Sequence, residues 1–218
     1  MENKSPRVLS KFITPLRLIF WGGLLCLFDF KFSQVSGREG FQVDVLSDLV
    51  GMILVVVGLS KIAMLPLPGR VAVGMKFLIG VGIVSALAAA LDHFIFRRPD
   101  ALVAMLQLLG LVELGSMMLF CGLMRSVCRD AGLSRPADSW RTTLVLFGVI
   151  YVIPLGFLHG AVLVAMATRT EFRIDVGPAV LLLLPVFFLP LVHLFISTSR
   201  MSRAAGASIG ASSAAVVK

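Results

Sequence analysis

Long apolar blocks separated by short polar connections dominate the chain. Each block is close to the roughly 20 residues that a helix needs to cross the hydrocarbon core of a bilayer. Because lipid offers no water to backbone N–H and C=O groups, each block is expected to be helical. The pattern predicts an all-α bundle of six spans, at residues 12–32, 47–65, 74–96, 101–124, 142–167 and 176–197.

The polar connections contain residues that end helices. Gly and Pro are the strongest local signals for turns. No stretch long enough for a separate soluble domain remains, so the sequence predicts a single transmembrane domain over residues 1–203. The small residues at 204–218 predict a flexible tail. The connections read SGREG at 36–40, PLPGR at 66–70, RRPD at 97–100 and SRPADS at 134–139.

The first block has the shortest apolar centre, the 11 residues Leu18–Phe28. It crosses a bilayer only if Arg17 extends toward one interface while Asp29 and Lys31 reach the other. A cleaved signal peptide is the alternative, because a basic start and a short apolar centre precede the small-residue segment VSG at 35–37. No A-x-A-like cleavage site follows, which favours a retained span.

Composition supports a membrane protein: the 218 residues are 58% hydrophobic and 15% charged, whereas soluble domains are about half apolar and a quarter charged. The net charge of +8 is unevenly distributed. Fourteen of the 20 Lys and Arg residues lie in the N-terminal segment, the second and fourth connections with their flanks, and the tail. Because cytoplasmic loops carry the excess of Lys and Arg, the sequence predicts both termini in the cytoplasm.

The basic residues also decide the expected partners. On the cytoplasmic face they would attract anionic lipid head groups. Nucleic acid is not expected, because no basic stretch is interleaved with aromatic residues and no DNA- or RNA-binding motif is present. The cysteines Cys26, Cys121 and Cys128 form no CxxC pair, so they are expected to be packing residues. No metal or cofactor is expected.

One carboxylate interrupts the fourth block: Glu113, within LLGLVELGSMM at 108–118. An acid near the bilayer centre costs about 2.5–3.5 kcal/mol on insertion scales and usually faces the bundle interior or water. His159 in the fifth block lies within GFLHG, a GxxxG spacing that permits close helix contact, and Gln107 stands at a similar depth. The sequence therefore predicts an intramembrane polar site of Glu113, His159 and Gln107, serving a proton relay or a polar solute. The alternative is a hydrogen bond that only fixes helix packing.

A second polar group is expected at the outer rim, formed by Asp29, Asp48, Asp92 and His93. Carboxylate oxygens and imidazole attract cations, so these residues are a candidate cation site. Their spacing is not that of a metal-binding motif, and Asp48 also suits a helix start, where an acid complements the helix dipole. Solvated loop acids are therefore the alternative.

Two prolines interrupt the sixth block. Pro185 and Pro190 lack a backbone N–H and predict a kinked helix. His193, three residues beyond Pro190, is expected to have a structural role.

FDF at 28–30, followed by VDVLSDLVGMILVVVGLSKI at 43–62, resembles the first-hairpin motif of small uncharacterised bacterial multi-pass membrane proteins. Their pattern is roughly FD…DxLxDxxGxxL…GL. The match covers 35 residues, about a sixth of the chain, and departs at Ser47, where the family tends to have proline. The resemblance implies a bacterial inner-membrane setting with no known activity, and it assigns no functional residues.

A non-enzyme is expected, because the chain lacks GxxxxGK[ST] and HExxH and its Ser-rich tail offers no base for a nucleophile. The favoured hypothesis is a small transporter-like permease of a bacterial-type plasma membrane, proton-linked through Glu113 and His159. The alternative is a non-catalytic accessory or structural subunit that packs against a membrane partner or a second copy of the chain. An enzyme acting on lipid or prenyl substrates would need a metal-binding acid pair, which was not found.

Overall fold

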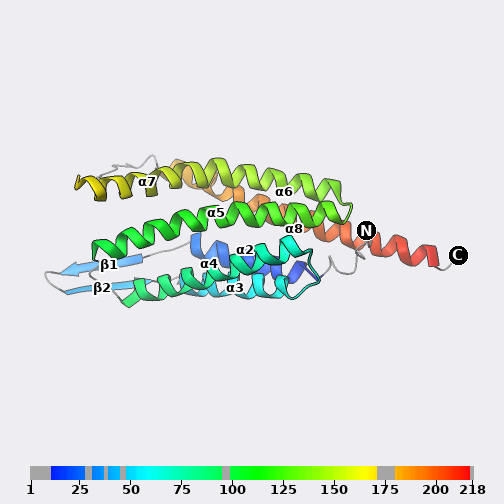
Figure 1. Cartoon of the computed structure of the whole chain (residues 1–218), viewed down its shortest axis with the longest axis horizontal. Helices are drawn as coiled ribbons and strands as arrows, with labels where there is room; N and C mark the ends of the chain where they lie inside the picture. Colours follow the sequence, from blue (N-terminus) through cyan, green and yellow to red (C-terminus); the bar gives the residue numbers. More distant parts are fainter. Residues whose placement is uncertain are drawn as a thin grey trace.

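The computed structural model describes residues 11–27, 31–36, 39–44, 48–94, 99–170 and 180–216, which form an elongated helix bundle with a short β-hairpin at one end (Figure 1). A π-helical turn, η1, joins the helices labelled α6 and α7 without a break. The elements in chain order are α2 (Ile13–Leu27), β1 (Lys31–Ser36), β2 (Glu39–Asp44), α3 (Asp48–Ala63), α4 (Gly69–Phe94), α5 (Asp100–Asp130), α6 (Ser134–Phe147), η1 (Gly148–Val152), α7 (Ile153–Thr168) and α8 (Val180–Val216).

Neighbouring helices run in opposite directions along the bundle. The α3–α4 and α5–α6 turns lie at the end where α2 begins, whereas the hairpin and the end of α7 lie at the other end (Figure 1). α2 packs along α3, and α8 packs on both α6 and α2. The end that carries the two turns is called the basic end here, and the opposite one the hairpin end, since the turns are flanked by Lys61, Arg70, Arg129 and Arg135.

The first predicted span ends earlier than expected. α2 ends at Leu27, and residues 31–32, which the sequence pattern places in that span, begin β1. The two strands are antiparallel, with Lys31 opposite Asp44 and Ser36 opposite Glu39. Strands of six residues carry too short an alternation to stand out beside blocks of about 20 apolar residues.

Two further boundaries differ from the prediction. The expected linker 134–139 is the start of α6, because Pro136 lies in the first turn, where its missing N–H costs no helical hydrogen bond. The expected flexible tail also differs, since α8 stays helical through Val216. This segment is rich in alanine, the residue with the highest helix propensity, and Ala205 is fully buried in the bundle.

Three of the described helical stretches are long and apolar enough to cross a membrane. Large apolar side chains face outward along two of them: Met105, Ile153 and Phe157 are 66–75% exposed. Apolar surface exposed to this extent marks contact with a membrane or with another protein. The helices therefore fit the membrane-protein class expected from the sequence. The three stretches are Gly69–Leu91, Asp100–Asp130 and Ser134–Thr168.

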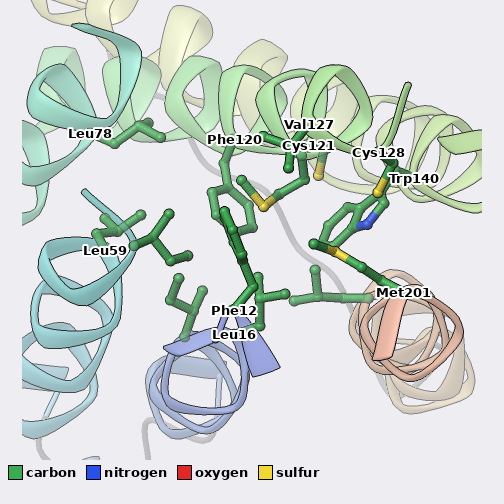
Figure 2. Packing of buried hydrophobic residues seen from close by; sticks show 14 of the residues in the cluster. Phe12, Leu16, Leu59, Leu78, Phe120, Cys121, Val127, Cys128, Trp140 and Met201 are labelled. Carbon is green, nitrogen blue, oxygen red and sulfur yellow. The ribbon is translucent and has the colours of Figure 1, made fainter. Parts of the chain in front are cut away.

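The most buried side chains gather at the basic end. Figure 2 shows Phe12 and Leu16, from the start of α2, directed toward Phe120 of α5, with Trp140 of α6 and Met201 of α8 beside them. Trp140 is fully buried, and its ring meets Phe120 edge-on at 5.9 Å between centroids. Leu59 of α3 and Leu78 of α4 belong to the same core (Figure 2), which therefore joins helices α2, α3, α4, α5, α6 and α8.

Glycines let α2 and α3 approach until their backbones touch. A Cβ added at Gly22 would lie 2.5 Å from the carbonyl oxygen of Gly51, and one added at Gly58 would lie 2.8 Å from that of Pro15. Small residues at helix contacts are typical of membrane bundles, where close backbone packing replaces the hydrophobic driving force.

Candidate functional site

Two of the three residues predicted for the intramembrane site meet between α5 and α7. His159 Nδ1–H donates a hydrogen bond to Oε1 of Gln107. Both side chains are half-buried. A neutral imidazole that donates through one nitrogen keeps a lone pair on the other, so Nε2 of His159 is left as a proton acceptor.

The His159 ring lies against the backbone of α5 at Gly110. A Cβ added at Gly110 would lie 2.6 Å from Cε1 and 2.7 Å from Nε2 of the ring. By contrast, a Cβ added at Gly156 or Gly160 meets nothing within 4 Å. The two glycines of the GxxxG pattern in α7 therefore do not form the close helix contact. Gly110 on the facing helix α5 forms it.

Glu113, the third predicted residue, is half-buried one turn farther along α5. Its backbone carbonyl accepts a hydrogen bond of 2.7 Å from Ser116 Oγ. Within the described parts of the chain, its carboxylate forms no hydrogen bond or ion pair, with His159 or with any other residue. Gln107 and His159 thus form a hydrogen-bonded pair, and Glu113 lies one turn beyond Gly110 on α5 without bonding to that pair.

The expected cation site at the outer rim falls largely outside the described residues. Asp48 is the first residue of α3, and its carbonyl accepts a hydrogen bond of 3.7 Å from Cys26 Sγ. The side chains of Asp29, Asp92 and His93 are not described. Among the side chains that are, no group of three His, Cys, Asp or Glu residues could hold a metal ion.

A second polar cluster, absent from the sequence-based predictions, links α6 to α8. Thr143 Oγ1 lies 2.9 Å from His193 Nδ1 and 2.8 Å from Ser197 Oγ. Ser139 Oγ lies 2.8 Å from Ser197 Oγ and accepts a hydrogen bond of 3.2 Å from the guanidinium of Arg200. These five residues are called the hydroxyl chain below.

Chemistry fixes one direction of donation in the hydroxyl chain: Arg200 can only donate, so Ser139 Oγ accepts from its guanidinium. The contacts between the hydroxyls fit donation in either direction. Thr143 Oγ1 also lies 3.2 Å from the carbonyl of Ser139, to which it can donate, and Ser197 Oγ lies 3.4 Å from His193 Nδ1. The three hydroxyl residues are at most 3% exposed, so their hydroxyls stabilise the α6–α8 contact and offer no surface to a solute.

The sequence contains a signal for this cluster that was not used. Ser139 and Thr143 are four residues apart on one helix, and so are His193 and Ser197 on the other. Residues at this spacing share a helix face. One polar pair at the start of the fifth block and one at the end of the sixth therefore favour a polar contact between the helices.

A π-helical turn lies between the two polar sites along the α6–α7 helix. The Ile153 amide donates to the carbonyl of Gly148, five residues back, directly before Pro154, which has no N–H to donate. Tyr151 in this turn is buried, and its hydroxyl donates to the carbonyl of Phe187 on α8. This bond adds a second polar tie between the α6–α7 helix and α8.

One motif in the tail fits a hydrolase pattern by spacing alone. GASIG at 206–210 has the GxSxG arrangement, whose nucleophile stands on a sharp turn between a strand and a helix. Here the segment lies within the continuous helix α8, so no such turn is formed. The motif gives no support to a hydrolase.

Comparisons of the chain with protein-family models, with curated proteins and with solved structures give no match. The Gln107–His159 pair and the hydroxyl chain must therefore be interpreted from their chemistry.

Proposed function

We propose that the chain crosses a bacterial-type plasma membrane six times, with both termini in the cytoplasm. The crossings would be α2, α3, α4, α5, the α6–η1–α7 helix and α8. The antiparallel arrangement in Figure 1 supports this topology, because it gathers Lys61, Arg70, Arg129 and Arg135 at one end of the bundle. An excess of Lys and Arg is typical of the cytoplasmic side.

Reporter fusions test the topology. Alkaline phosphatase, which is active only outside the cytoplasm, should be active when fused after Arg38, Asp100 or Arg173. A fusion after Arg135 should be inactive. The reverse pattern would mean that the basic end faces outward, which would contradict the proposed orientation.

We further propose that this membrane protein is a small permease whose proton-linked site comprises Gln107, His159 and Glu113. The observation that carries the proposal is the His159–Gln107 hydrogen bond beside Gly110. It leaves Nε2 of His159 as a proton acceptor. Glu113 stands three residues after Gly110, on the same face of α5. Ionisable groups at such depth are usually functional, and two of them at adjacent turns can exchange a proton.

The test uses purified protein in liposomes that contain a pH-sensitive dye. Small polar solutes are added outside, and the wild type should show a solute-dependent change in internal pH. Glu113→Gln should abolish this change while the protein still inserts and accumulates, because the amide cannot exchange a proton. Asp138→Asn is the matched control, since Asp138 is exposed at the basic end. Equal signals from Glu113→Gln and the wild type would contradict the proposal.

The alternative is an accessory membrane subunit without transport activity. It is supported by the outward-facing apolar side chains Met105 and Phe157, which another membrane helix would cover. In this case Glu113→Gln would not change the function of the protein in cells, and a partner protein would co-purify with the chain in mild detergent. A chain that purifies alone and shows the solute-dependent pH signal would exclude this function.

A further inference from the structure

We propose that a cavity between α2 and α8 at the basic end binds the phosphate group of an anionic membrane lipid. The cavity has a volume of about 200 Å³. It is lined by Arg17 of α2, by Arg203 of α8 and by the hydroxyl residues Ser199 and Ser202. None of the described residues that line it is acidic. This site is independent of the proposed transport activity, but it rests on the proposed topology, in which the basic end faces the cytoplasm.

The polar groups around the cavity have free hydrogen-bonding capacity. Across the described residues, neither Arg17 nor Arg203 forms an ion pair, and the hydroxyls of Ser199 and Ser202 make no hydrogen bond. Thr198 differs, because its hydroxyl donates to the carbonyl of Leu194 at 2.9 Å. Two positive groups at one small cavity repel each other, and an anion between them removes that repulsion.

Phosphate is the anion that these side chains fit best. A guanidinium presents N–H groups in a planar fork that binds two phosphate oxygens at once. Arg17 comes from α2 and Arg203 from α8, and the hydroxyls of Ser199 and Ser202 are available to donate to the remaining oxygens. A lipid phosphodiester, which carries one negative charge, leaves the occupied site net positive and therefore able to favour lipids with a further anionic group.

Aromatic residues place the cavity at the depth of lipid head groups. Phe195 lines the cavity, and its ring centroid is 5.3 Å from that of Phe20, which in turn packs edge-on against Trp21. Trp21 is 54% exposed and stands one turn beyond Arg17, on the same side of α2. Tryptophan is enriched at membrane–water interfaces. We expect the arginines of the cavity to lie at the depth of the head groups, and Phe195 to lie beside the start of the acyl chains.

This combination favours a lipid over free phosphate. Basic pockets between helices at the cytoplasmic side of membrane proteins bind anionic lipid head groups. The apolar residues Ile13 and Phe195 belong to the same lining as the two arginines. Inorganic phosphate would gain nothing from them, whereas a lipid gains from both parts of the cavity.

The experiment uses the full chain in a neutral detergent, titrated with phosphatidylglycerol, phosphatidylcholine or inorganic phosphate. Native mass spectrometry counts bound lipids, and the shift in unfolding temperature reports phosphate. The wild type should bind one phosphatidylglycerol more tightly than phosphatidylcholine. The double variant Arg17→Gln/Arg203→Gln should bind it at least tenfold more weakly. Arg70→Gln/Arg141→Gln removes the same charge from exposed positions outside the cavity and should bind like the wild type.

A second variant keeps the charge and fills the space. Ser202→Leu retains both arginines but places a larger side chain at the cavity, so it should also lose the bound lipid. Equal weakening by the cavity variant and the Arg70/Arg141 control would overturn the site in favour of general surface charge. Unchanged binding by Ser202→Leu would overturn it as well, and stabilisation by inorganic phosphate equal to that by phosphatidylglycerol would overturn the assignment to a lipid.

Discussion

His159 and His193 both accept or donate a hydrogen bond across a helix–helix contact, but their surroundings differ. His193 ends a chain of buried hydroxyls that runs from Arg200 through α6 and back to α8. His159 has one described partner, Gln107, and lies against a glycine on the facing helix. The first histidine contacts two hydroxyls of a larger network through Nδ1, whereas the second belongs to a single pair; within the described residues, neither ring forms a hydrogen bond through Nε2.

The contrast teaches that an imidazole in an apolar block is not informative by itself. In a low-dielectric interior, a fully satisfied polar network stabilises one arrangement of the helices, and each unsatisfied member is costly. The buried hydroxyls of Ser139, Thr143 and Ser197 all have partners, which favours a structural role for His193. Beside the Gln107–His159 pair stands Glu113, whose carboxylate has no described partner, and a second ionisable group of this kind is what a proton exchange would need.

The largest expected effect is a difference in the free energy of unfolding between variants in the packed core of the basic end and variants on the outward face of α7. Trp140→Ala removes a fully buried ring and should lower the free energy of unfolding by about 3–5 kcal/mol. Phe157→Ala removes a ring that is 75% exposed and should change it by no more than about 0.5 kcal/mol. Denaturant unfolding in detergent micelles measures both, and equal losses would contradict the described packing.

The next effect concerns the glycine beside His159. Gly110→Ala forces the imidazole away from α5 and should cost about 1–3 kcal/mol, because the added Cβ has no free space. Gly160→Ala on the facing helix meets no atom within 4 Å and should stabilise the helix by about 0.4–1 kcal/mol. Thermal unfolding of the two variants gives the comparison. A stabilised Gly110→Ala would show that α5 and α7 are not in contact at this point.

Two adjacent threonines test the hydroxyl chain. Thr143→Val keeps the side-chain shape but removes the hydrogen bonds of Thr143 with Ser197 and His193, which should cost about 1–3 kcal/mol. Thr142→Val removes only an exposed hydroxyl that donates to the carbonyl of Asp138, so a much smaller loss is expected. The same unfolding assay compares them, and a neutral Thr143→Val would mean that the chain contributes nothing to stability.

The sequence predicts the long helices because a bilayer imposes length and apolarity on every span. It predicts their ends less well. At Pro136 a residue that usually signals a break lies in the first turn of α6, where it is tolerated. The helical tail after Arg203 follows from alanine propensity, which the small-residue composition concealed.

For the candidate site, spacing along the helices is enough to place Gln107 and His159 at one depth. It cannot give the rotation of each helix about its axis, which depends on packing with all neighbours. That rotation brings Gly110 under the His159 ring and leaves Glu113 beside the pair. It also brings Ser139 and Ser197 together. The four-residue spacing of Ser139 with Thr143 and of His193 with Ser197 indicates a polar face on each helix, but not that the two faces meet.

The finest test of the two settings is which nitrogen of each ring carries the proton. His159 donates through Nδ1 to Gln107, whereas Nδ1 of His193 lies 2.9 Å from Thr143 Oγ1 and 3.4 Å from Ser197 Oγ. Because hydroxyls can donate to this nitrogen, ¹⁵N NMR of the neutral rings should find opposite tautomers: the proton on Nδ1 of His159 and on Nε2 of His193. His159→Asn and His193→Asn assign the signals. Gln107→Leu should release the His159 ring into a mixture of tautomers without affecting His193. A single tautomer shared by both rings would contradict this difference between the Gln107–His159 pair and the hydroxyl chain.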